Sequence, residues 1–103
     1  MYKICFMPEV FDDLDKLPKE VLKEVKSYFN AYKINPFAYS QPLQNKFGLN
    51  LSSCRKTYVA NATYRIILQV ENKVAKVVCI IAVGKREDLK AYKEADLRIK
   101  SNT

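Results

Sequence analysis

The chain has 103 residues, of which 49% are apolar and 28% are charged, and it carries a formal net charge of +7. A chain of this length builds one domain around a single modest core. Its longest uninterrupted apolar run, VVCIIAV, is far shorter than the roughly 20 residues that span a bilayer, and its first residues do not resemble a signal peptide, so we expect a cytoplasmic protein.

The first third of the sequence predicts a strand followed by two helices. The stretch YKICF reads as a short strand, and apolar residues then recur at helical spacing through PEVFDDLDKL and PKEVLKEVKSYFNAYK. Pro18 opens the second helical stretch and interrupts the pattern, so we expect an αα-hairpin hinged at this proline. Residues 34–53 contain Pro36, Pro42 and Gly48 without a clean period, which indicates an irregular connection.

The remaining residues predict strands and a last helix. Three strand-like stretches follow one another, RKTYVA, TYRIILQV and AKVVCIIAVG. They are separated at Asn61 and Asn72, and asparagine tolerates the left-handed conformation of tight hairpins, so an antiparallel meander is expected. Residues 88–100 have helical spacing. The sequence therefore predicts an α+β fold in one domain, 1–103: an N-terminal strand and an αα-hairpin packed on an antiparallel sheet of about four strands, with a short C-terminal helix.

The cysteines and the absence of histidine restrict the chemistry. Cys5, Cys54 and Cys79 are widely spaced and form no CxxC pair, and no histidine is present to complete a metal site. Cys5 and Cys79 lie in apolar strand-like runs, so we expect them to be buried as small hydrophobic residues. A catalytic cysteine would need a nearby base that this chain does not supply as histidine, which disfavours a cysteine mechanism. We expect no metal and no cofactor.

The positive charge is concentrated in the second half of the chain. Residues 1–53 contain seven basic and six acidic residues, whereas residues 54–103 contain eleven basic and five acidic ones. This imbalance favours a surface that binds a polyanion. The alternative is that these basic residues only solvate exposed strand edges and the C-terminal helix.

Strand alternation suggests where the cations meet. Lys56 and Tyr58 share one face of their strand. The next strand has a wholly apolar side, which should meet the helices, so Arg65 points to the opposite side. The hairpin at Asn61 brings Arg65 close to Lys56 or Tyr58, which predicts a basic cleft on the sheet face left uncovered by the helices. Taken singly, Arg65 reads as a half-exposed strand arginine, and Tyr58 and Tyr92 as rim residues.

The order of these motifs resembles a known family. SCRKTYVANATYRIILQV followed by VVCIIAVGKREDLKAYKEADLRI, after a strand and a proline-hinged helical pair, is similar to the RelE/ParE superfamily of toxins from toxin–antitoxin systems. The likeness covers nearly the whole chain and is closer to the RelE branch, whose members cleave mRNA in the ribosomal A site. The resemblance implies the RelE-like microbial RNase fold, an mRNA endoribonuclease that inhibits translation, and two partners, a cognate antitoxin and the mRNA-loaded ribosome.

The resemblance also implies catalytic residues. By motif position they are Lys56, Arg65, Arg86 and Tyr92, and Tyr58 stands where the RelE branch usually has a second lysine. Attack by an RNA 2′-hydroxyl on the adjacent phosphate requires a base, a stabiliser of the anionic transition state and an acid. Tyrosine has a reference pKa near 10, and clustered cations favour its ionised form. We therefore expect Tyr92 to be the base, Arg86 and Arg65 to stabilise the transition state, and Lys56 to contact the phosphate or protonate the leaving group.

Three further basic residues are expected to bind RNA beside the catalytic set: Arg55, Lys85 and Lys90. Two other functions remain open at this point. A ParE-like chain would inhibit DNA gyrase without catalysis, and an inactive relative would bind nucleic acid with a strong salt dependence but cut neither RNA nor DNA.

Overall fold

The computed structural model describes residues 1–43, 54–85 and 90–101, and the side chains of the last segment from residue 94. In these segments the strand, the two helices and the tail helix predicted from the sequence are all present. The elements in chain order are β1 (Lys3–Phe6), α1 (Glu9–Asp15), α2 (Lys19–Ile34), β2 (Gln41–Pro42), β3 (Cys54–Val59), β4 (Tyr64–Glu71), β5 (Val77–Lys85) and α3 (Lys90–Ser101). Within the described segments, no helix has the length and apolar character needed to cross a membrane.

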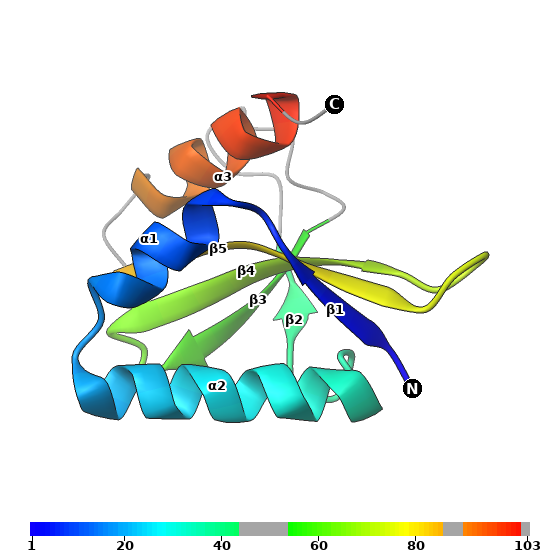
Figure 1. The fold of residues 1–103 in the computed structure, drawn as a ribbon, viewed down its shortest axis with the longest axis horizontal. Helices are drawn as coiled ribbons and strands as arrows, with labels where there is room; N and C mark the ends of the chain where they lie inside the picture. The colour runs from blue at the N-terminus through cyan, green and yellow to red at the C-terminus, as the bar shows by residue number, and fades with distance from the viewer. Residues whose placement is uncertain (44–53, 86–89, 102–103) are drawn as a thin grey trace.

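The strands form one sheet in the order β1-β5-β4-β3-β2, which gives five strands in the described part of the chain (Figure 1). The predicted antiparallel meander of β3, β4 and β5 is confirmed. Two expectations about the sheet were wrong. It is mixed because β1 pairs parallel with β5, and it has a fifth strand because β2 pairs with β3 inside the region expected to be irregular. A two-residue strand has no periodicity to detect, and strand direction depends on the path of the chain over the sheet.

One face of the sheet packs against α2, as the alternation in β4 predicted. The core on this face contains Ile66 and Leu68 from β4 and Val25, Phe29 and Tyr32 from α2. Burying an aliphatic or aromatic side chain of this size stabilises the fold by about 1.5 to 3 kcal/mol. The helical stripe on α2 therefore acts as core.

Tyr32 joins α2 to β3 by a polar link within this core. Its hydroxyl is hydrogen bonded to Thr57 Oγ1, and Thr57 in turn donates to the carbonyl oxygen of Tyr39 at 2.6 Å. Because the single hydroxyl proton of Thr57 goes to Tyr39, Tyr32 must be the donor in the first bond. Burial raises the pKa of Tyr32 above its ordinary value, so the phenol remains neutral and keeps this donor.

The opposite face of the sheet is partly covered, which corrects the expectation that helices leave it open. Ala95 from α3 is fully buried there with Ile67 and Ile81, and Ile99 packs against the same cluster. A β-bulge in β5 assists this packing, because the pairing shifts between Ile67 and the next residue and places Ile81 and Ala82 on the same side. The tail helix thus has its own small core.

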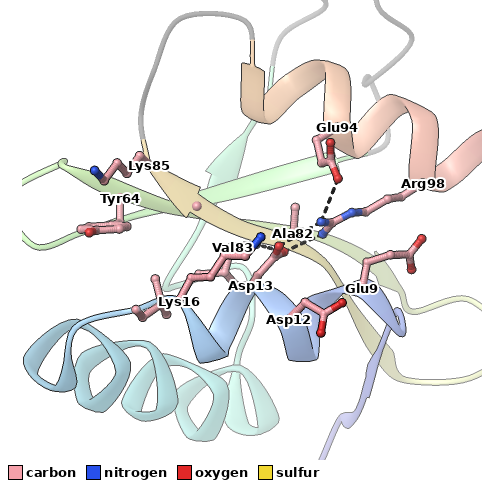
Figure 2. Close-up of a pocket in the computed structure, with 12 residues that line it drawn as sticks. Glu9, Asp12, Asp13, Lys16, Tyr64, Ala82, Val83, Lys85, Glu94 and Arg98 are labelled. Carbon is pink, nitrogen blue, oxygen red and sulfur yellow. Dashed lines mark hydrogen bonds and ion pairs between the residues drawn. The ribbon is translucent and has the colours of Figure 1, made fainter.

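The edge of β5 is closed by side chains where β1 ends. β1 pairs with β5 only as far as Ile80, and beyond that point the backbone N–H of Val83 donates to Asp13 Oδ2 at 3.1 Å. Arg98 donates to the carbonyl oxygen of Ile81 at 2.9 Å and binds both carboxylate oxygens of Asp13, at 2.6 and 2.9 Å (Figure 2). One ion pair therefore connects α1, α3 and the unpaired edge of β5.

The turn between β3 and β4 lies where the sequence predicted it, and it is anchored on α2. Ala60, Asn61 and Ala62 all have positive φ angles, of 53°, 54° and 66°. This conformation is unfavourable for residues with a Cβ, by roughly 1 to 2 kcal/mol each. The N–H of Ala60 donates to both carboxylate oxygens of Glu24, at 3.3 Å each, which holds the turn in place.

The edge ion pair predicts a large loss of stability on removal of one partner. Arg98 and Asp13 side chains are 7% and 13% exposed, so Asp13→Ala leaves a buried guanidinium that retains only the more exposed carboxylate of Glu94. We expect the free energy of unfolding, measured by urea denaturation, to fall by about 3 to 5 kcal/mol. The control is Glu94→Ala, which removes the other, 54% exposed carboxylate partner of Arg98 and leaves Asp13 in place, so it should cost less than about 1 kcal/mol. Equal losses in the two variants would contradict the role of Asp13.

Candidate functional site

Three of the five predicted catalytic residues meet around one aromatic ring. Tyr58 on β3 lies directly opposite Arg65 on β4, so the two side chains share a face of the sheet. The Lys56 Nζ lies 5.0 Å from the centroid of the Tyr58 ring, and the Arg65 Cζ lies 5.7 Å from it. Both distances are within the range of cation–π attraction. We call Lys56, Tyr58 and Arg65 the cation–tyrosine cluster.

Arg65 is much less accessible than the sequence suggested. Its relative exposure is 3%, whereas Lys56 and Tyr58 are half-buried. The alternative of a half-exposed strand arginine was therefore wrong. A buried cation needs compensating interactions, and the electron-rich face of Tyr58 supplies one. Arg65 is thus the buried member of the cation–tyrosine cluster, whereas Lys56 and Tyr58 reach solvent.

Gly84 continues the same surface on β5. It lies directly opposite Arg65, and a Cβ built at this position would meet no atom within 4 Å. The described residues therefore leave open space at this position, on the strand next to Arg65. A glycine inside a strand often marks the close approach of a ligand or a backbone, and this was a signal that the sequence offered but the motif search did not use.

The other two predicted catalytic residues are placed only in part. Arg86 lies outside the described residues. Tyr92 lies in the first turn of α3, and its side chain, like that of Lys90, also lies outside them. The assignments of Arg86 and Tyr92 as catalytic residues and of Lys90 as an RNA ligand therefore remain predictions.

Arg55 and Lys85 lie apart from the cation–tyrosine cluster. Arg55 points to the face covered by α2, where its guanidinium donates to the side chain and the carbonyl oxygen of Ser40, at 2.7 and 2.9 Å, and stacks 4.9 Å from the ring of Phe37. Lys85 is exposed and lies opposite Tyr64, on the same side as α1. The structure thus separates these two predicted RNA ligands from Lys56, and Arg55 has a structural task in holding the turn before β2.

A pocket of about 530 Å³ lies elsewhere, between α1, β5 and α3 (Figure 2). It has four carboxylates and three cations, which are Glu9, Asp12, Asp13, Glu94, Lys16, Lys85 and Arg98. Arg98 pairs there with both Asp13 and Glu94. The acidic side chains of α1 would repel a phosphodiester, so we do not place an RNA site in this pocket. Among the described residues, no group of three acidic or cysteine side chains could hold a metal ion.

Comparison with solved structures identifies the fold. A mutant Escherichia coli toxin RelE in the free state matches with a TM-score of 0.72 and 28% identity, over 95% of this chain and 97% of that chain. The intact E. coli RelBE toxin–antitoxin complex contains a chain that matches with a TM-score of 0.64 and 25% identity, over 84% and 99%. The structure therefore has the fold of RelE toxins, and this likeness supports a place in the RelE/ParE toxin superfamily.

The RelE fold extends to distant members of the superfamily. A chain of the archaeal RelE–RelB complex from Pyrococcus horikoshii OT3 matches with a TM-score of 0.62 at 20% identity, over 84% of this chain and 97% of that chain, and at this identity the likeness concerns the fold alone. No protein-family model and no curated protein matches the sequence. The likeness to RelE toxins therefore rests on tertiary structure.

The cluster geometry predicts that Arg65 depends on the aromatic ring of Tyr58. Tyr58→Leu removes the ring and leaves the buried guanidinium against an aliphatic side chain, whereas Tyr58→Phe keeps the ring and removes only the hydroxyl. We expect the leucine variant to be less stable than the phenylalanine variant by about 1 to 2 kcal/mol in chemical denaturation. Stabilities that agree within error would show that the ring does not support Arg65.

Proposed function

We propose that this protein is the toxin of a type II toxin–antitoxin system and that it cleaves mRNA in the ribosomal A site. The observation that carries the proposal is the cation–tyrosine cluster, which lies on the sheet of a RelE fold matched over 95% of the chain by E. coli RelE. Lys56 and Tyr58, which reach solvent, are the members of the cluster available to bind RNA.

The proposed reaction is attack by a 2′-hydroxyl on the adjacent phosphate, which yields a cyclic phosphate and a free 5′-hydroxyl. Lys56 contacts the phosphate or protonates the leaving oxygen. Tyr92 is the base, and Arg86 stabilises the negative charge of the transition state. The ribosome holds the mRNA in a fixed orientation, which lowers the activation barrier by several kcal/mol. Cleavage of free RNA should therefore be weak.

The burial of Arg65 revises its proposed role. A side chain that is 3% exposed does not reach a bound phosphate without rearrangement, so we propose that Arg65 positions Tyr58 and adds positive potential behind the cleft. Tyr58 replaces the second lysine usual in the RelE branch and packs against both neighbouring cations. The replacement exchanges a mobile charge for a rigid ring that fixes Lys56 beside Arg65.

The proposed partners are a cognate antitoxin and the ribosome. Solved relatives include toxins in complex with RelB antitoxins from E. coli and P. horikoshii. The net charge of +7 favours an acidic, amphipathic antitoxin segment that covers the basic face. The same charge favours association with ribosomal RNA.

Mapping RNA ends after brief expression tests the function. Expression in a bacterial host should produce new mRNA 5′ ends within open reading frames, phased with codons and dependent on translation. Blocked replication and DNA damage with intact messages would replace the proposal with gyrase inhibition. RNA binding that disappears at high salt, without new 5′ ends, would indicate an inactive binding module.

A matched pair of lysine variants tests the site. Lys56→Gln and Lys23→Gln remove the same charge, one from the cation–tyrosine cluster and one from the exposed face of α2. In single-turnover cleavage of ribosome-bound mRNA at equal occupancy, we expect Lys56→Gln to lower the rate by about 100-fold. Lys23→Gln should retain the wild-type rate. Arg86→Ala and Tyr92→Phe extend the series, and unchanged rates in both would dismiss their catalytic assignment.

A further inference from the structure

Two cysteines face each other across the first pair of strands. Cys5 on β1 and Cys79 on β5 are directly opposed in the parallel register, so both side chains project from the same face of the sheet. Their neighbours confirm the face: Ile4 and Phe6 pack into the core with α2, and Cys79 packs against the opposite cluster. Neither cysteine takes part in the proposed RNA chemistry.

The exposure of the pair differs from the expectation that both thiols are buried. Cys5 is exposed, because its short strand lies at the edge of the sheet, and Cys79 is half-buried. Adjacent strands lie about 4.8 Å apart, within the Cα separation of roughly 4.4 to 6.8 Å that disulfides span. The pair is therefore close enough to be joined, and one of its thiols can meet a reagent from solution.

We propose that Cys5 and Cys79 are a redox-modification site that closes into an intramolecular disulfide on reaction with a small-molecule disulfide. Cys5 thiolate attacks one sulfur of the reagent, which forms a mixed disulfide and releases one thiolate. Cys79 thiolate then attacks the Cys5 sulfur and releases the second. The protein loses two protons and two electrons, and the reagent disulfide is reduced to two thiols.

The surroundings of the two thiols set the order of these steps. Cys5 reacts first because it is exposed, whereas Cys79 is half-buried. Burial and the neighbouring Cys5 raise the pKa of Cys79 to about 12, so Cys79 is a poor nucleophile in the reduced protein. The contribution of the Cys5 thiol to that rise is removed once Cys5 is in a mixed disulfide, and the proximity of the two residues then favours ring closure over a second encounter with reagent.

Formation of the disulfide would join the edge strand β1 covalently to its neighbour β5. β1 contributes the outermost strand and leads into α1, which carries Asp13. The disulfide would keep β1 paired with β5 and restrict unfolding from the N-terminus. Lys56, Tyr58 and Arg65 lie on other strands, so the proposal does not depend on RNA cleavage.

Thiol counting and peptide mapping test the modification. The folded protein is equilibrated in glutathione buffers of increasing disulfide content, quenched with acid, unfolded and alkylated. We expect the number of alkylated cysteines to fall from three to one, with the buried Cys54 remaining. Trypsin digestion without reductant should then give the peptides 4–16 and 77–85 joined, at two hydrogens below the sum of their masses, and dithiothreitol should separate them.

Variants that each lack one cysteine provide the controls. Cys54→Ala should form the same cross-link, whereas Cys5→Ser and Cys79→Ser should not. Circular dichroism verifies that each variant is folded before oxidation. Oxidised wild-type protein should melt at a higher temperature than reduced protein, and Cys79→Ser should show no such shift. A product in which Cys5 carries only glutathione, or joins a second chain, would overturn the proposal, and a cross-link without a higher Tm would overturn its stabilising effect.

Discussion

The edge of β5 is the constraint on which the placement of the other elements depends. β5 has β4 along one side for its whole length, but β1 accompanies it on the other side only as far as Ile80. Unpaired backbone groups at a covered edge are costly unless side chains satisfy them. Asp13 and Arg98 do so from two different helices, and the ion pair between them raises the pKa of the Arg98 guanidinium, mainly through the hydrogen bond to Asp13. This pair fixes α1 and α3 against the strand that leads toward Arg86.

The two halves of β5 thus serve different purposes. The half beside β1 brings Cys5 and Cys79 together at an accessible edge, where a covalent bond could reinforce backbone pairing. The half beyond the bulge is held by an ion pair and carries Gly84 next to the cation–tyrosine cluster. The β-bulge separates these regions, because its extra residue turns both Ile81 and Ala82 toward α3. The cysteine pair and the proposed site therefore lie at opposite ends of one strand.

The cation–tyrosine cluster also shows how charge is divided in the proposed site. Arg65 is buried away from solvent, whereas Lys56 remains accessible beside the same ring. A fixed interior cation supplies a constant potential, and an accessible lysine supplies a contact that can adjust to substrate. Tyr58 keeps the two at a defined separation. A lysine at position 58, as is usual in the RelE branch, would add a third charge but no such spacer.

The sequence by itself determined the helices, the β3–β5 meander and the sharing of one face by Lys56, Tyr58 and Arg65, because helical and strand periodicities are local properties of the chain. Only tertiary structure decided that β1 runs parallel to β5, that Gln41 and Pro42 form a strand, and that Arg65 is buried. It also decided that Arg55 is hydrogen bonded to Ser40 and that Cys5 lies opposite Cys79 at an edge of the sheet. These outcomes depend on contacts between residues far apart in the chain, which no local pattern encodes.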